Sequence, residues 1–146
     1  MYSFNGTFTY RLDDKNRIRI PAKFKKDLGS DYKLTLAPGN CLSVLPQEEY
    51  AKILEGFGRV PYFDEAAQRD IAAFTSCVFD VSEDPQGRIV LPEMLKKYAN
   101  IDRDIVIMGA ATHIRIESAE AYEARTAKTD LSALFARLNS YGKKDE

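Results

Sequence analysis

Short runs in which apolar and polar residues alternate recur along the chain, a pattern typical of half-buried β-strands. In residues 7–12 the apolar side chains of Phe8, Tyr10 and Leu12 fall on one face, and polar side chains fall on the other. Residues 17–20 (RIRI) alternate arginine with isoleucine in the same way. Similar runs predict six further strands, at residues 32–37, 41–45, 78–81, 88–91, 105–108 and 113–116.

Helical segments are predicted between and after these strands. Pro21 and Pro92 suit the first turn of a helix, where a missing N–H costs nothing, and they predict short helices over residues 22–28 and 92–100. Ser118 is a favourable cap for a helix that follows it. Three further helices are expected: from Pro46 to about Leu54, from near Asp64 onward, and after Thr129. In the helix that begins near Asp64, the side chains expected toward the core are Ala66, Ala67, Ile71 and Phe74.

The order of elements repeats because the sequence itself repeats. Residues 13–28 (DDKNRIRIPAKFKKDL) align with residues 84–99 (DPQGRIVLPEMLKKYA) at an offset of 71. The aligned pairs are Asp13 with Asp84, Arg17 with Arg88, Ile18 with Ile89, Ile20 with Leu91, Pro21 with Pro92, Phe24 with Leu95, and Lys25-Lys26 with Lys96-Lys97. Such a duplication indicates two copies of one supersecondary unit.

Each copy is too short to bury a secure core alone, so we expect the two to share one core about a pseudo-two-fold axis. The fold class expected is mainly β with peripheral α-helices, and the hairpins of the two copies should interleave. Eight strands could then close into a double-split, swapped-hairpin β-barrel that leaves few exposed edges. The expected divisions are a first repeat at 5–50, a helical connector at 51–75, a second repeat at 76–122, and a C-terminal helix with a polar tail at 123–146.

Composition places the chain among ordinary globular proteins. With 146 residues, 45% hydrophobic and 29% charged, it has the size and balance of one soluble domain or of two small, closely fused ones. No apolar run approaches the length of a membrane span, and residues 1–14 lack the pattern of a secretory signal, so we expect a cytoplasmic protein. Cys41 and Cys77 lie in apolar segments and are expected to be buried, reduced thiols.

Charge is distributed unevenly along the chain. Residues 11–26 carry seven basic and two acidic residues, although the formal net charge of the whole chain is only −1. Because several of these charges alternate with isoleucines in a strand, they should gather on one side of one element. A local basic surface of this kind is the electrostatic pattern expected of nucleic-acid binding.

The repeated chemistry is an Asp followed four residues later by an Arg, at Asp13 and Arg17 and again at Asp84 and Arg88. The Asp can accept hydrogen bonds from the turn or pair with the Arg, which begins the next strand. Such an arginine, held on a rigid turn, suits guanine edges and phosphates. The alternative is that Asp and Arg only hold the turn together and that the basic residues solvate a strand.

With these two strings, the sequence resembles the MraZ family of bacterial transcriptional regulators, within the wider AbrB-like, swapped-hairpin DNA-binding group. The resemblance covers residues 1–125 and includes the N-terminal MYSFNGTFTYRLDD and the stretch CLSVLPQEEY. It implies a double-split barrel, assembly into rings of eight or more subunits, and nucleoid association. It also implies binding to repeated promoter elements upstream of a division and cell-wall gene cluster, commonly with repression of the protein's own gene.

The resemblance also suggests roles for individual residues. Arg17 and Arg88 would be the main contacts to double-stranded DNA, Asp13 and Asp84 would shape the loops, and Lys15, Arg19 and Lys23 would contact phosphates. Two positions depart from the common pattern, because Asn16 stands where many relatives have Gly and Asp14 adds a negative charge to the first loop.

The sequence bears on two other classes of function, an enzyme and a protein-interaction module. No cofactor or metal site is predicted and an enzyme is not expected, because glycine-rich phosphate loops and metal-ligand spacings are missing and the one histidine, His113, reads as an ordinary strand residue. A protein-interaction adaptor or antitoxin-like module is the alternative function. The helices at residues 46–55 and 118–140 could build ring contacts or could equally be core helices.

Overall fold

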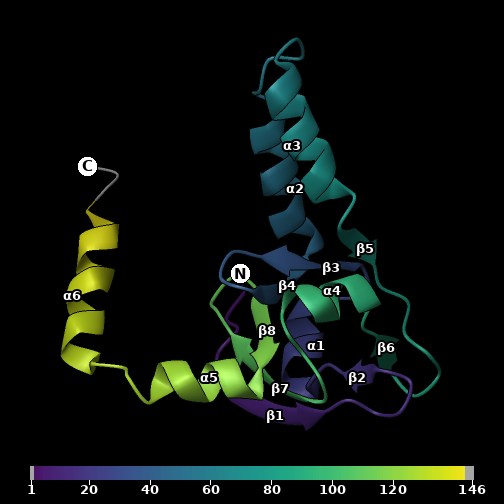
Figure 1. The fold of residues 1–146 in the computed structure, drawn as a ribbon, viewed down its shortest axis with the longest axis vertical. Coiled ribbons are helices and arrows are strands. Elements are labelled where there is room, and N and C mark those ends of the chain that lie inside the picture. Colours follow the sequence, from purple (N-terminus) through teal and green to yellow (C-terminus); the bar gives the residue numbers. More distant parts are fainter. Residues whose placement is uncertain (1, 144–146) are drawn as a thin grey trace.

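A six-stranded antiparallel sheet forms the centre of the protein (Figure 1). The computed structural model describes residues 2–143. In spatial order the sheet contains β1 (Thr7–Arg11), β7 (Asp104–Gly109), β8 (Ile114–Ser118), β4 (Cys41–Pro46), β3 (Tyr32–Ala37) and β5 (Val78–Asp80). A separate two-stranded ribbon pairs β2 (Arg17–Arg19) with β6 (Arg88–Val90). All eight predicted strands are present, each within two residues of its predicted ends.

The two sequence copies exchange strands, as predicted. β1 of the first copy pairs with β7 of the second, and β5 of the second copy pairs with β3 of the first. The strand order is therefore the same when the copies are interchanged. The pseudo-two-fold axis passes between Ile18 and Ile89 in the ribbon, which are aligned at the offset of 71 and lie directly opposite in register. One inserted residue raises the offset to 72 in the strands that follow, and there the axis passes between Ser43 and Arg115, which also lie directly opposite.

The expected closed barrel is not found, and this part of the predicted fold is wrong. Among the described residues, β1 and β5 each pair with one neighbouring strand and so form the edges of an open sheet. The ribbon strands pair only with each other, over three residues each. Each copy continues from its ribbon strand through one further residue to Pro21 or Pro92, and proline has no N–H with which to extend the ladder toward a sheet edge.

The main core lies between the sheet, the ribbon and two short helices, α1 (Ala22–Leu28) and α4 (Glu93–Tyr98). Equivalent residues of the two copies meet there. Ile18 and Ile89 face inward from the ribbon, and Phe24 and Leu95 face inward from the helices, all with at most 1% of their surface exposed. The ribbon is thus anchored by its buried face, which leaves its other face to solvent.

Two helical arms extend from the rest of the protein (Figure 1). One contains α2 (Gln47–Phe57) and α3 (Glu65–Thr75), whose Phe57 and Phe74 rings pack edge to face with centroids 5.8 Å apart. The second contains α5 (Ala119–Thr126) and α6 (Leu131–Gly142). Asp64 and Ser118 cap their helices by accepting hydrogen bonds from the N–H groups of Ala67 and Ala121.

Three of the expectations from the sequence are met only in part, and they concern helix α3, the cysteines and the C-terminal tail. Helix α3 begins where predicted, but it packs on α2 and contributes no buried residue to the main core. Cys41 is fully buried, whereas Cys77 is only half-buried, and both are free thiols. The last three residues of the predicted polar tail lie outside the described residues. Within the described part of the chain, no helix combines the length and apolar character needed to cross a membrane.

Candidate nucleic-acid interface

The first repeated turn is built around the carboxylate of Asp13. Its Oδ1 accepts hydrogen bonds from the backbone N–H groups of Lys15 and Arg17, each at 2.9 Å, and its Oδ2 accepts one from Arg17 Nε at 2.7 Å. The Asp13 carbonyl accepts a bond from the Asn16 N–H at 3.0 Å. Asn16 has φ of 58°, a left-handed conformation that asparagine tolerates better than most residues.

The second turn repeats this geometry bond for bond. Asp84 Oδ1 accepts from the N–H groups of Gln86 and Arg88 at 2.9 Å, and Asp84 Oδ2 accepts from Arg88 Nε at 2.7 Å. Gly87 occupies the left-handed position with φ of 78°. The Asp and Arg therefore do hold the turn together, as the alternative interpretation of the motif required. The same bonds also fix each guanidinium by its Nε.

The hydrogen bonds that each turn donates to its Asp lower the pKa of both carboxylates. Desolvation raises the pKa of Asp13, but the bonds from Arg17 and Lys15 outweigh it and leave the pKa below its ordinary value. For Asp84 the backbone bond from Arg88 is the largest effect, and the pKa is again lowered. Each turn is consequently held by an ionised carboxylate at neutral pH.

The ribbon places both motif arginines on one surface. Arg17 lies directly opposite Val90, and Arg19 lies directly opposite Arg88. Residues that are opposite in an antiparallel pair project from the same face, and the intervening Ile18 and Ile89 are buried on the other. Three arginines are thereby gathered on the outer face of two short strands, hereafter called the ribbon face (Arg17, Arg19, Arg88 and Val90).

The two turns also contact each other. Arg17 Nη1 lies 3.8 Å from Asp84 Oδ2, so the first motif reaches into the second. The side chains of Arg17 and Arg88 are only 23% and 24% exposed, because each is bonded to the Asp of its own turn. Because Nε of each arginine donates to its Asp, the donors left for other contacts are the Nη atoms, and Arg17 Nη1 is already near Asp84.

The remaining predicted site residues divide into two groups. Lys15 and Arg19 are exposed beside the motif arginines. Lys23 does not join them: its Nζ donates to Asn5 Oδ1 at 2.7 Å, and Asn5 precedes β1 whereas the first turn follows β1. Lys23 is therefore anchored toward the opposite end of that strand. Its position in a continuous basic run was not sufficient to place it at the turn.

Two side chains near the turns were not singled out from the sequence. Lys96 Nζ donates to Asn16 Oδ1 at 2.8 Å and so tethers the first turn to helix α4 of the second copy. Arg103 Nη1 lies 3.1 Å from Asp14 Oδ1, which partly offsets the extra negative charge of the first loop. The repetition of the Lys-Lys pair hinted at Lys96, but nothing local in the sequence pointed to Arg103.

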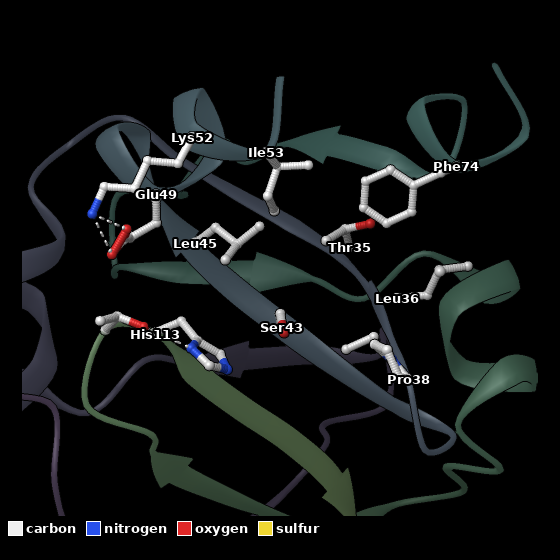
Figure 2. A pocket seen from close by; sticks show the side chains of 12 residues that line it. Thr35, Leu36, Pro38, Ser43, Leu45, Glu49, Lys52, Ile53, Phe74 and His113 are labelled. Atoms are coloured by element: carbon white, nitrogen blue, oxygen red, sulfur yellow. Dashed lines mark hydrogen bonds and ion pairs between the residues drawn. The ribbon is translucent and has the colours of Figure 1, made fainter. Parts of the chain in front are cut away.

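A separate pocket of about 370 Å³ lies between the α2–α3 arm and the sheet (Figure 2). Leu45, Ile53 and Phe74 contribute apolar walls, and Ser43, Glu49 and His113 also line it. His113 Nδ1 is within 3.2 Å of Thr112 Oγ1, and burial lowers the pKa of its ring. Glu49 pairs with Lys52, so among residues 2–143 these groups form no hydrogen-bonded Ser–His–acid relay. Nor do three His, Cys, Asp or Glu side chains of that range converge to hold a metal ion.

Sequence comparisons agree with this geometry. The family model described as "MraZ protein, putative antitoxin-like" matches residues 3–72 and 78–139. A "Transcriptional regulator MraZ" from Clostridium tetani is 37% identical over 140 residues, which are 95% of this chain and 99% of the relative. Proteins of the same name from Salinispora arenicola and Bifidobacterium longum are 36% and 32% identical, over 87% and 86% of this chain and 89% and 83% of their own.

The matched residues include both Asp–Arg turns, the ribbon and the strands that the two copies exchange. The match therefore extends over the duplicated architecture as a whole and is not limited to one motif. From the family model and the extent of the relatives, this chain belongs to the MraZ family.

Proposed function

We propose that this protein is a transcriptional regulator that binds double-stranded DNA in a sequence-specific manner through the ribbon face and its two turns. The observation that carries the proposal is the juxtaposition of two Asp–Arg turns with the same hydrogen bonds, which bring Arg17 and Arg88 onto one surface. The names of the relatives supply the regulatory part of the proposal.

The chemistry of the ribbon face suits base edges and phosphates. A guanidinium held by its Nε still offers Nη donors, which can bind the acceptors on guanine or a phosphate. Arg17 and Arg88 are the proposed base contacts. Exposed Lys15 and Arg19 are the proposed phosphate contacts, and Asp13 and Asp84 orient the turns. Lys23, which lies toward the other end of β1, would act only through long-range attraction.

The ribbon face and turns of a single copy offer few cations, so we propose that several copies bind together. Sequence-independent affinity grows with the number of phosphates neutralised, and linked weak sites gain strongly from multivalency. Helix α6 supports assembly because Leu131, Phe135 and Leu138 are more than half exposed at helical spacing. We propose that the protein forms a homo-oligomeric ring of eight or more subunits. The ring would bind repeated promoter elements upstream of its own division and cell-wall gene cluster. It would act there as a repressor, in the cytoplasm and associated with the nucleoid.

A protein partner is the second candidate. The family description includes the term antitoxin-like, and the α2–α3 arm ends in Tyr62 and Phe63, which are 80% and 95% exposed. Such a tip could contact a protein. An apolar protein contact depends only weakly on ionic strength, whereas binding through phosphate contacts weakens steeply as salt rises. The salt dependence of binding therefore distinguishes the two candidates.

The test is footprinting of the purified protein on DNA upstream of its own gene, followed by titration of the protected duplex at several salt concentrations. We expect protection of repeated elements and an affinity that falls steeply as salt rises. Absence of protection, or an affinity that does not respond to salt, would contradict the proposal and favour the protein partner.

A further inference from the structure

The ribbon face breaks the two-fold symmetry of the protein at one position. Arg17 and Arg88 are equivalent under the duplication, and so are Arg19 and Val90. Three of the four corners are therefore arginines, and the fourth is a valine that is 59% exposed. Val90 is the one apolar residue of the ribbon face, and to one side it lines a pocket with Phe79 and Pro92. The equivalent Arg19 lines the corresponding pocket with Phe8 and Pro21, so this position accepts a cation as well.

The fold does not require an apolar residue at this corner. The neighbouring Ile89 and Leu91 are each 1% exposed and supply the anchoring contacts of the strand. The equivalent residue, Arg19, is also exposed and fits the same ribbon geometry. The packing of the fold therefore does not explain why an apolar residue stands at this position. We look for the reason in the molecule that the ribbon face contacts.

Val90 is also well placed beside a base-reading group. It lies directly opposite Arg17, and the Cβ atoms of such opposite residues are about 4.5–5.5 Å apart. Successive bases along one DNA strand rise by about 3.4 Å. If Arg17 contacts one base pair, the side chain of Val90 is within reach of the next.

We propose that Val90 is a specificity-determining residue that packs on the C5-methyl group of a thymine. This inference rests on the proposed DNA binding by the ribbon face. Thymine presents its methyl group only in the major groove, where apolar side chains distinguish it from other bases. The ribbon face therefore enters the major groove, and the first and second copies read different bases despite their matching turns.

The test uses the duplex that the protein protects upstream of its own gene, with each thymine replaced in turn by uracil, which lacks only the methyl group. For the wild-type protein, one replacement in each bound element should weaken binding by about fourfold, the value of one buried methylene-sized group. V90A, whose shorter side chain makes less contact with the methyl group, should distinguish the thymine and uracil duplexes less well than the wild type at that position. V90R, which restores the symmetry of the ribbon face, should likewise lose the distinction and respond more steeply to salt.

Leu54→Ala is the matched control. Leu54 is 43% exposed on α2, which covers the face of the sheet opposite to the ribbon, so this variant should keep the wild-type preference for thymine. Circular dichroism and thermal unfolding confirm that each variant is folded. Equal binding of all uracil duplexes by the wild type, or an unchanged preference in V90A, would overturn the inference and leave DNA binding itself intact. Failure to bind any upstream duplex would instead refute the proposed function, and this inference with it.

Discussion

The two Asp–Arg turns share one geometry but differ in every residue between the Asp and the Arg. The first turn contains Asp14, Lys15 and Asn16, and the second contains Pro85, Gln86 and Gly87. Even so, the bonds from the turn to the Asp carboxylate have the same lengths in both. The turn thus depends on its Asp, its Arg and a residue that accepts a positive φ, and the other positions are free to vary in charge.

That freedom separates the two turns electrostatically. The first is tethered by Lys96 and approached by Arg103, and its ribbon strand carries an additional arginine, Arg19. The second turn has Gln86 where the first has Lys15, and its ribbon strand has Val90 where the first has Arg19; all four residues are exposed. The two copies therefore share the scaffold that holds the arginines but differ in the charges around them. Under the proposed function, this difference would let a symmetric fold bind an asymmetric DNA element.

The largest expected effect is on the arginines themselves. Arg17→Ala and Arg88→Ala should each weaken binding to the protected duplex by about 1–3 kcal/mol. Arg17→Ala should cost more, because Arg88 has Arg19 directly opposite to compensate, whereas Arg17 has Val90. Titration of both variants against the same duplex measures the difference, and a greater loss for Arg88→Ala would contradict the proposed division between the copies.

A smaller effect is expected from the left-handed positions of the turns. Gly87→Ala should destabilise the folded chain by about 1–2 kcal/mol, since an ordinary L-residue is strained in this conformation. The structure leaves open space around a Cβ at Gly87, so the cost is one of backbone conformation alone.

Gly87→Asn is the matched control for that prediction. Asparagine already occupies the equivalent position as Asn16 with φ of 58°, so this variant should lose less stability than Gly87→Ala. Urea unfolding compares the two variants with the wild type. Equal losses for alanine and asparagine would show that the two turns are not interchangeable in conformation.

The smallest effect concerns the exposed tips of the turns. Lys15→Gln should reduce the dependence of log affinity on log salt by about one per bound subunit, and Gln86→Lys should increase it by about one. Neither change touches the bonds that hold the turns, because these use the backbone N–H groups of both residues. Affinities measured over a range of salt would contradict the prediction if the two slopes stayed at the wild-type value.

The sequence predicted those features that depend on local pattern and on the duplication. Alternation located all eight strands, Pro21 and Pro92 located the short helices, and the aligned Asp and Arg residues located the turns. The exchange of strands followed from two copies too small to fold separately. The bonds between Asp and Arg could be anticipated because their spacing of four residues closes a turn.

Features that depend on contacts between distant segments could not be predicted from the local sequence pattern or from the duplication. An open sheet and a closed barrel have the same strand pattern, and only the short reach of β2 and β6 before their prolines decides between them. Lys23 belongs to the basic run in sequence, but its hydrogen bond to Asn5 holds it near the other end of β1. The contact between Arg17 and Asp84 likewise depends on the register of the ribbon, which no local pattern specifies.

The most direct measurement is the affinity of the Arg17→Ala, Arg88→Ala double variant for the protected duplex, determined by fluorescence anisotropy beside a circular dichroism spectrum. If the paired turns form the DNA-binding surface, the folded double variant should bind on the order of a hundredfold more weakly or worse. A double variant that keeps the wild-type spectrum and the wild-type affinity would show that DNA is bound elsewhere on the protein, or not by these arginines at all.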